Sequence, residues 1–176
     1  LAVTLFALIL GRLIGRGLRL QKFSSRLGQI ARDEIATTAK NQPHWSTGFQ
    51  TGTLLFCATP MALLGSIADG LVGQWQPLLI KGIMEGMAAF GFVSLFGGSL
   101  ILAALPVFAL QGTITLACAE YLKPFLEQQR LLDSALVIDG WLITFVAVMI
   151  LEIRKVELAD YLPALTIAPL LAWLWR

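Results

Sequence analysis

The sequence predicts an all-α, polytopic integral membrane protein: a single transmembrane domain over residues 1–176 with about five to six transmembrane helices. Three observations favour this fold class. Of the 176 residues, 57% are hydrophobic and only 14% are charged, whereas soluble domains are about 45–50% apolar and about 25% charged. So few charges cannot cover a surface that faces water, and a bilayer is the expected solvent. The third observation is an uncharged run of 34 residues, 86–119.

The first predicted element is residues 1–18, an apolar run whose second half carries Arg12 and Arg16. Basic residues mark the cytoplasmic end of a span, so this run is expected to be the last part of a longer hydrophobic segment. The sequence starts within the run and without a methionine. We therefore expect further segments before Leu1, which makes the number of predicted helices a lower bound.

Residues 19–46 are predicted to form an amphipathic cytoplasmic loop, because apolar residues recur there at near-helical spacing among polar ones. A short helix on the membrane surface or against the protein would satisfy this pattern. Basic residues concentrate in 11–46, and cytoplasmic loops are enriched in lysine and arginine, so this loop is expected inside the cell. The seven basic residues are Arg12, Arg16, Arg19, Lys22, Arg26, Arg32 and Lys40.

The next predicted spans are 48–68, 77–96 and 99–118. The uncharged run 86–119 would reach about 51 Å as one helix, at about 1.5 Å per residue. This length exceeds the roughly 30 Å of a hydrocarbon core. The chain is therefore divided at the glycine pair 97–98, which permits a tight reversal.

The last predicted elements are a span at 134–151, a charged loop at 152–160 and a short apolar segment at 161–175. Alternation from the first loop places the basic residues of 152–160 inside the cell. The final segment ends in tryptophans, which favour the membrane–water interface.

Proline and glycine residues predict breaks in several of these helices. In TPMALLGSIADGLVG (59–73), Pro60 should disturb the helix, and Gly65 and Gly70 should let the backbone leave helical geometry. Irregular backbone at membrane depth is tolerated where protein or a cavity satisfies its polar groups, and transporters bind substrates at such breaks. Further breaks are predicted at Gly97, Gly98 and Pro106.

Lys81 and Glu85 are ionisable residues in an apolar segment, and their spacing of four positions places them on one helix face. A charge at membrane depth costs about 2.5–3.5 kcal/mol on insertion scales, so such residues usually face protein or a water-filled cavity. One interpretation is a self-neutralising pair that reaches the interface. The other is a titratable or gating pair along a permeation path.

Asp69, Asp139 and Gln111 also have two interpretations each. Asp69 is either an exposed loop residue, or a cation or proton site, or a partner for Lys81. Asp139 either occupies an interfacial position near the start of a helix, where a carboxylate suits the helix dipole, or belongs to the path. Gln111 in LQGTIT, like Gln50 in FQTGT, either joins helices or lines a polar path.

The sequence contains no pattern of a known catalytic site. P-loop, HExxH, paired-cysteine and GxSxG patterns are absent from it. An intramembrane hydrolase with Asp69 and Asp139 as a dyad is an alternative that no family signature supports. We therefore expect no enzymatic activity, no cofactor, no metal site and no nucleic-acid partner.

Four stretches resemble a family of bacterial inner-membrane proteins, the domain of unknown function 554 family of YdfK/YqgA-like proteins. They are GTLLFCATPMALLGSIADGL (52–71), KGIMEGMAAF (81–90), AALPVFALQGTITLACA (103–119) and LPALTIAPLLAWL (162–174). The resemblance extends over 1–176 and implies a transporter with no assigned substrate, preceded by additional hydrophobic segments. It also implies two related halves, so that LAVTLFALILGRL and LPALTIAPLLAWL are candidate equivalents in an inverted repeat.

These features predict a transporter or channel for a small ion or solute in the bacterial inner membrane, crossing it several times. Asp69, Lys81, Glu85, Gln111 and Asp139 would line or gate the path. The alternative is a structural or accessory membrane protein, in which three GxxxG spacings serve packing within the chain or between copies. Expected partners are the bilayer, the ion or solute and a second copy of the chain. The three spacings are Gly11–Gly15, Gly48–Gly52 and Gly82–Gly86.

Overall fold

The computed structural model describes residues 2–38 and 45–174, and every regular element in these ranges is a helix. The all-α prediction is therefore confirmed. The α-helices are α1 (Ala2–Gly17), α2 (Leu20–Thr38), α3 (Trp45–Cys57), α4 (Pro60–Val72), α5 (Gln76–Phe96), α6 (Ala104–Ala117), α7 (Lys123–Gln128), α8 (Leu132–Ile150) and α9 (Ala164–Leu174). Two 3₁₀ segments, η1 (Gly97–Ala103) and η3 (Leu158–Tyr161), and one π-helical turn, η2 (Cys118–Leu122), complete the chain.

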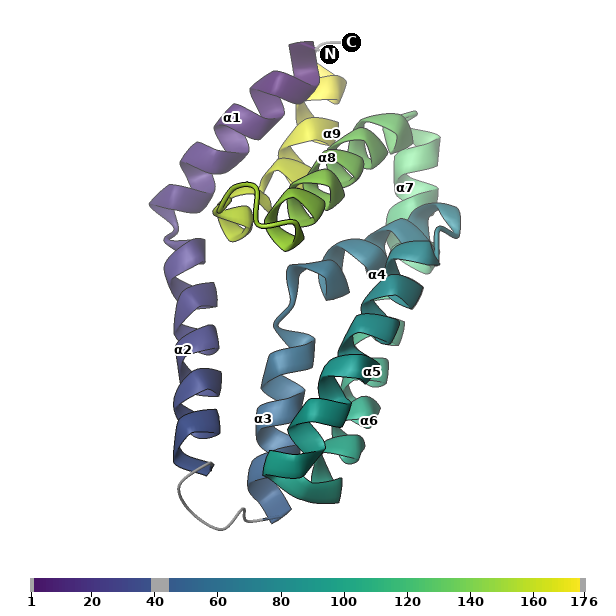
Figure 1. The fold of residues 1–176 in the computed structure, drawn as a ribbon. Helices are drawn as coiled ribbons and strands as arrows, with labels where there is room; N and C mark the ends of the chain where they lie inside the picture. The colour runs from purple at the N-terminus through teal and green to yellow at the C-terminus, as the bar shows by residue number, and fades with distance from the viewer. Residues whose placement is uncertain (1, 39–44, 175–176) are drawn as a thin grey trace.

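The helices form two groups that α4 joins (Figure 1). In the first group α1, α8, α9 and η3 pack on one another, and in the second α3 packs on η1 and α6. Helix α4 contacts α8 of the first group as well as α5 and α6 of the second. Any site beside α4 is therefore built from both groups.

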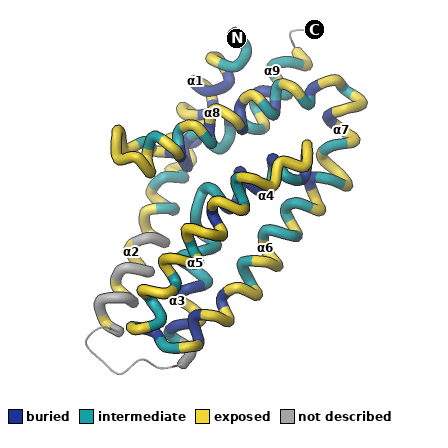
Figure 2. The backbone as a smooth tube through the Cα atoms, turned by 45° about the vertical axis from the view of Figure 1, so that its right-hand side comes forward, coloured by how far each residue is buried: buried dark blue, intermediate teal, exposed yellow. Residues whose placement is uncertain are grey.

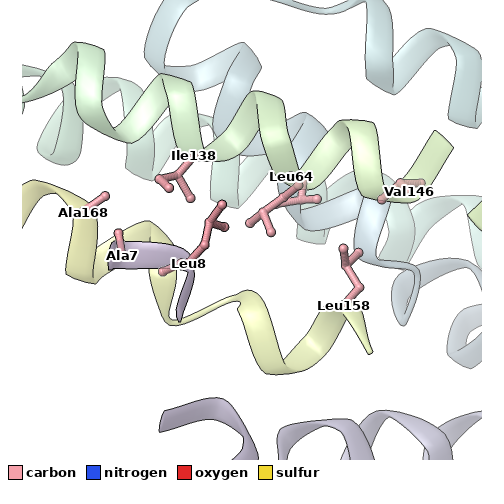
Figure 3. Close-up of a cluster of buried hydrophobic side chains, with 9 residues drawn as sticks. Ala7, Leu8, Leu64, Ile138, Val146, Leu158 and Ala168 are labelled. Atoms are coloured by element: carbon pink, nitrogen blue, oxygen red, sulfur yellow. The ribbon is translucent and has the colours of Figure 1, made fainter. Parts of the chain in front are cut away.

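The larger core cluster lies where α1, α4, α8, η3 and α9 meet, and Figure 3 shows its side chains pointing toward one another. Leu64 of α4 and Ile138 of α8 are fully buried at its centre, and Leu158 of η3 is 2% exposed. Full burial of a large aliphatic side chain contributes about 1.5–3 kcal/mol. This cluster fixes α4 against α8.

The described residues contain fewer candidate membrane-spanning segments than the five to six helices that the sequence predicts. By length and composition, two segments within residues 2–38 and 45–174 qualify, Gln76–Gln128 and Leu132–Ile150, or three if the bent pair of α3 and α4 forms one span. The helices α3 and α4 have 13 residues each as described, whereas a crossing needs about 20. Figure 2 shows long exposed stretches on α5 and α6, where Met87, Phe90 and Phe108 are 70–84% exposed. Apolar exposure of this extent suits lipid contact.

The predicted breaks fall at some of the proposed residues and not at others. Helices α3 and α4 meet at a bend of 59° directly before Pro60. Gly65 and Gly70, in contrast, lie within the unbroken α4. A β-carbon on Gly70 would meet the Thr115 carbonyl oxygen and the Cys118 side chain. These glycines therefore permit close helix contact, and the prediction that they break the helix was wrong.

The glycine pair 97–98 follows the end of α5, whereas Pro106 does not interrupt α6. Gly97 has φ +70°, outside helical geometry, and the chain continues through Gly98 into η1. Helices α5 and α6 then run in opposite directions (Figure 2). Pro106 is the third residue of α6, in the first turn, where a missing N–H is tolerated. The predicted break at Pro106 was wrong for this reason.

The predicted loop 19–46 contains α2, a helix of 19 residues, longer than the short helix expected. Part of the prediction, residues 39–44, lies outside the described residues, as do Trp175 and Arg176 at the other end. Helix α2 contacts α3 and η3, and Arg19, with φ 56°, marks its junction with α1. The segment therefore lies against the protein, one of the two arrangements its pattern allows.

Candidate functional site

The bend between α3 and α4 brings three polar side chains together. Pro60 starts α4, because its fixed φ suits the first helical position, and Thr59 before it has extended backbone with φ −74° and ψ 132°. Thr59 Oγ1 lies 3.5 Å from Glu85 Oε1, and Lys81 Nζ lies 2.5 Å from Glu85 Oε2. The i, i+4 spacing in α5 thus forms the ion pair that the sequence predicts, and Thr59, directly before α4, adds a hydroxyl to it.

The ion pair is largely buried among the described residues of the protein. The side chain of Lys81 is 4% exposed and that of Glu85 is 18% exposed. Both interpretations of the pair, at the interface or along a path, stay predictions, because this burial does not give the depth of the pair in a bilayer. A buried charge is retained only when it is paired and hydrogen-bonded, and here lysine, glutamate and threonine satisfy one another.

A cavity of about 340 Å³ opens beside the pair. Its polar lining is Thr59, Lys81 and Glu85, and the remaining lining is apolar. The volume lies at the lower end of ligand pockets, which enclose about 300–1,000 Å³ with a few polar groups among apolar ones. The apolar lining is Pro60, Met61, Met84, Val146, Met149, Ile150 and Leu158, from α4, α5, α8 and η3.

The arrangement provides one carboxylate, one ammonium group and one hydroxyl in an otherwise apolar cavity. A small cation could replace the Lys81 ammonium group as the partner of the Glu85 carboxylate. Both oxygens of this carboxylate already accept hydrogen bonds, from Thr59 and Lys81, and Glu85 lines the cavity. A solute carrying both charges could bind between the two residues. The described residues contain no group of three or more histidine, cysteine, aspartate or glutamate side chains placed to hold a metal ion.

Asp69 does not join this site. It lies in the last turn of α4, where its carbonyl oxygen accepts the N–H of Gly73 at 2.7 Å, and Gly73 has φ +73°. This geometry is a common way to end a helix. The half-buried Asp69 does not line the cavity that contains Lys81 and Glu85, so the predicted partnership with Lys81 was wrong.

Asp139 and Gln111 are inside the protein but outside the cavity. Asp139, the eighth residue of α8, is 2% exposed, and its Oδ1 atom has no hydrogen-bond partner among the described residues. The interpretation as an interfacial residue near a helix start was therefore wrong. Gln111 is half-buried in α6, and its Nε2 atom also lacks a partner within the described ranges.

Sequence reasoning missed Thr59 and the methionines that line the cavity. Thr59 precedes Pro60 directly, and a hydroxyl at the residue before a proline-initiated helix was the available signal. No local signal identifies Met61, Met84 and Met149 as neighbours, because three different helices carry them.

Two of the GxxxG spacings lie in contacts between helices of the chain, and the third lies on a face of α5 that the described residues leave uncovered. A β-carbon on Gly11 would meet Ala164, and one on Gly52 would meet Leu100, so α1 packs closely on α9 and α3 on η1. At Gly82 and Gly86 a β-carbon would meet nothing within 4 Å among the described residues. That face of α5 is therefore not covered by the described part of the chain.

Comparison with known proteins identifies relatives of this chain. It is 28% identical over 164 residues to the "Uncharacterized membrane protein YdfK" of Bacillus subtilis (strain 168), covering 93% of this chain and 66% of the relative. The chain thus spans just under two thirds of that protein's length. It is 25% identical over 177 residues to the "Uncharacterized protein YqgA" of Escherichia coli (strain K12), covering 99% of this chain and 74% of the relative. No solved structure matches it significantly. Residues 1–173 match the family described as "Protein of unknown function (DUF554)", and the chain belongs to that family.

Proposed function

We propose that this chain is the membrane-embedded part of a transporter or channel for a small ion or solute, with Thr59, Lys81 and Glu85 as its polar site. The observation that carries the proposal is the ion pair itself. Lys81 is 4% exposed, pairs with Glu85 at 2.5 Å and lines a cavity beside a helix bend of 59°. The role is not enzymatic and needs no cofactor.

Energetic considerations support a functional role for the pair. Replacing a buried ion pair by apolar residues of similar volume is often neutral or stabilising, so stability alone does not explain Lys81 and Glu85. Charged residues within membrane segments typically serve binding or conduction. Transporters also place binding sites at interrupted helices, and Thr59 stands at such an interruption.

The proposed location is the bacterial inner membrane, with several crossings and with residues 11–46 in the cytoplasm. The relative from Bacillus subtilis is named as a membrane protein, and two to three segments of this chain are long and apolar enough to cross. The contact of η3 with α1 and α2 supports a common side for the basic segment and the charged loop 152–160.

The second candidate function is structural or accessory, through association with a further copy of the chain. The uncovered Gly82–Gly86 face favours it, since small residues allow close contact between membrane helices. In this case the cavity binds nothing, and the ion pair serves only to position α5.

Flux measurements in proteoliposomes distinguish the two candidates. Purified protein is reconstituted, and the fluxes of Na⁺, K⁺, protons and a panel of small amino acids are followed with dyes or radiolabels. We expect one of these to move, and we expect Glu85→Gln and Lys81→Gln to reduce that flux at least about tenfold, the effect of losing one charged partner. Glu127→Gln, at an exposed position of α7, is the matched control and should not change it. Equal flux in Glu85→Gln and wild type would exclude the proposed site, and no flux of any probe would favour the accessory role.

A further inference from the structure

A second cavity, of about 360 Å³, lies between α1, α8 and η3 and shares no lining residue with the first. Leu5, Leu8 and Ile9 line the part nearer the start of α1, and Phe145 of α8 contributes a ring. Arg12 and Arg16 line the part nearer the end of α1. The lining thus changes from apolar to basic over about 16 Å of helix, at about 1.5 Å per residue.

The positive charge of this cavity is not balanced within the described chain. Arg12 Nη2 lies 3.8 Å from Glu157 Oε2, and its guanidinium group lies 5.6 Å from the centre of the Tyr161 ring. Both side chains of the ion pair are about half exposed, 49% and 51%, and such pairs contribute little. Arg16 has no ion pair within residues 2–38 and 45–174. One guanidinium group is therefore unpaired and the other is weakly paired.

We propose that this cavity binds an anionic phospholipid, with the phosphate of its headgroup at Arg12 and Arg16 and an acyl chain along Leu5, Leu8 and Phe145. A guanidinium group matches phosphate oxygens with two parallel hydrogen bonds. Basic pockets between membrane helices are recognised sites for anionic headgroups.

The apolar part of the cavity distinguishes a lipid from a free phosphate ion. Most of the lining residues are apolar, and a phosphate ion would leave this part of the cavity unfilled. The side of α1 outside the cavity is also apolar, with Phe6 56% and Ile14 46% exposed, which suits contact with hydrocarbon. Since α1, α8 and η3 each contribute lining residues, the bound lipid would hold these three elements together.

The test compares lipids and charge-matched variants in the purified chain. Native mass spectrometry in detergent measures the binding of phosphatidylglycerol and of phosphatidylcholine with the same acyl chains. The variant Arg12→Gln/Arg16→Gln should bind phosphatidylglycerol at least about tenfold more weakly, because two charge-assisted contacts are lost. The control Lys22→Gln/Arg26→Gln removes the same charge at exposed positions of α2 and should bind within about twofold of wild type.

A third variant tests the role of Glu157. Glu157→Gln removes the carboxylate that lies 3.8 Å from Arg12. It should tighten phosphatidylglycerol binding several-fold, because the carboxylate no longer competes with the lipid phosphate for the Arg12 guanidinium group. Thermal unfolding without lipid checks that the variants fold, and Arg16→Gln alone replaces the double variant if that one does not.

Three results would overturn the proposal. Equal weakening in both double variants would indicate a diffuse basic surface. Equal affinity for phosphatidylcholine would indicate an apolar groove without a headgroup site. Binding of inorganic phosphate alone at the same affinity would assign the cavity to a free anion.

Discussion

The backbone N–H of Gln21 donates a hydrogen bond of 2.9 Å to Asp160 Oδ1, across 139 positions of the sequence. Gln21 Oε1 accepts in return from the N–H of Ala159 at 3.3 Å. These two bonds attach the first turn of α2 to η3, and Asp160 is 3% exposed there. The junction of α1 with α2 and the loop before α9 are therefore one structural unit.

Asp160→Ala should lower the free energy of unfolding by about 1–3 kcal/mol, because the N–H of Gln21 loses its acceptor in a part-buried position. Asp33→Ala, at an exposed position in α2, should change it by less than about 0.5 kcal/mol. Thermal unfolding in detergent measures both. Equal effects of the two substitutions would show that the bond does not hold the junction.

Lys81→Met should destabilise the protein by about 3–5 kcal/mol, because it leaves the carboxylate of Glu85 in the cavity without its cation. Lys81→Met/Glu85→Met should recover most of this loss, since no buried charge is left. A double-mutant cycle of unfolding free energies measures the coupling. Additive single effects would contradict a paired site.

Gly70→Ala should be destabilising, because its β-carbon would lie 2.5 Å from the Thr115 carbonyl oxygen and 2.6 Å from the Cys118 side chain. Gly82→Ala is the matched control, because it meets no atom within 4 Å among the described residues. It should be neutral or stabilising by up to about 1 kcal/mol, the difference in helix propensity. Melting temperatures of the two variants in detergent test this contrast, and the opposite order would contradict the α4–α6 packing.

Asp69→Asn should leave the flux of the transported probe unchanged, whereas Glu85→Gln should reduce it. The reason is position: Asp69 ends α4, and Glu85 lines the cavity. The two substitutions remove the same charge, so proteoliposome flux compares location alone. A loss of flux in Asp69→Asn would place a second acidic residue on the path.

Asp139→Leu should raise the melting temperature, because Asp139 is 2% exposed and Oδ1 has no hydrogen-bond partner within the described ranges. Asp133→Leu, at an exposed position in the same helix, should give no such rise. If Asp139→Leu also abolishes flux, Asp139 is retained for function at the expense of stability. A lower melting temperature would mean that the carboxyl group has a partner in the folded protein.

The local sequence pattern was sufficient to predict the helical fold. It also predicted the contact of Lys81 with Glu85, because residues four positions apart lie on the same face of one helix. It was also sufficient for the bend before Pro60. The local pattern did not predict the cavity, because its lining from α8 and η3 comes beside the ion pair through the tertiary packing of the larger core cluster.

The roles of the helical glycines and the number of spans depend on tertiary contact in the same way. Gly65 and Gly70 have the sequence signature of a break, yet neighbours that come close, Leu78 and Thr115, give them a packing role. Hydropathy likewise counts apolar residues along the chain, whereas the apolar run 48–68 is divided between α3 and α4, which have 13 residues each as described. Helix length, set by where turns occur, decides which runs can cross.

The packing of α1 on α9 has a consequence for biosynthesis. Translation produces α1 first and α9 last among the described helices, yet Gly11 is covered by Ala164 and Gly15 by Asp160. Until η3 and α9 leave the ribosome, the described residues that cover Gly11 and Gly15 are missing, and closing so long a loop has an entropic cost. A truncation before residue 158 would therefore remove the residues that cover Gly11 and Gly15 of α1.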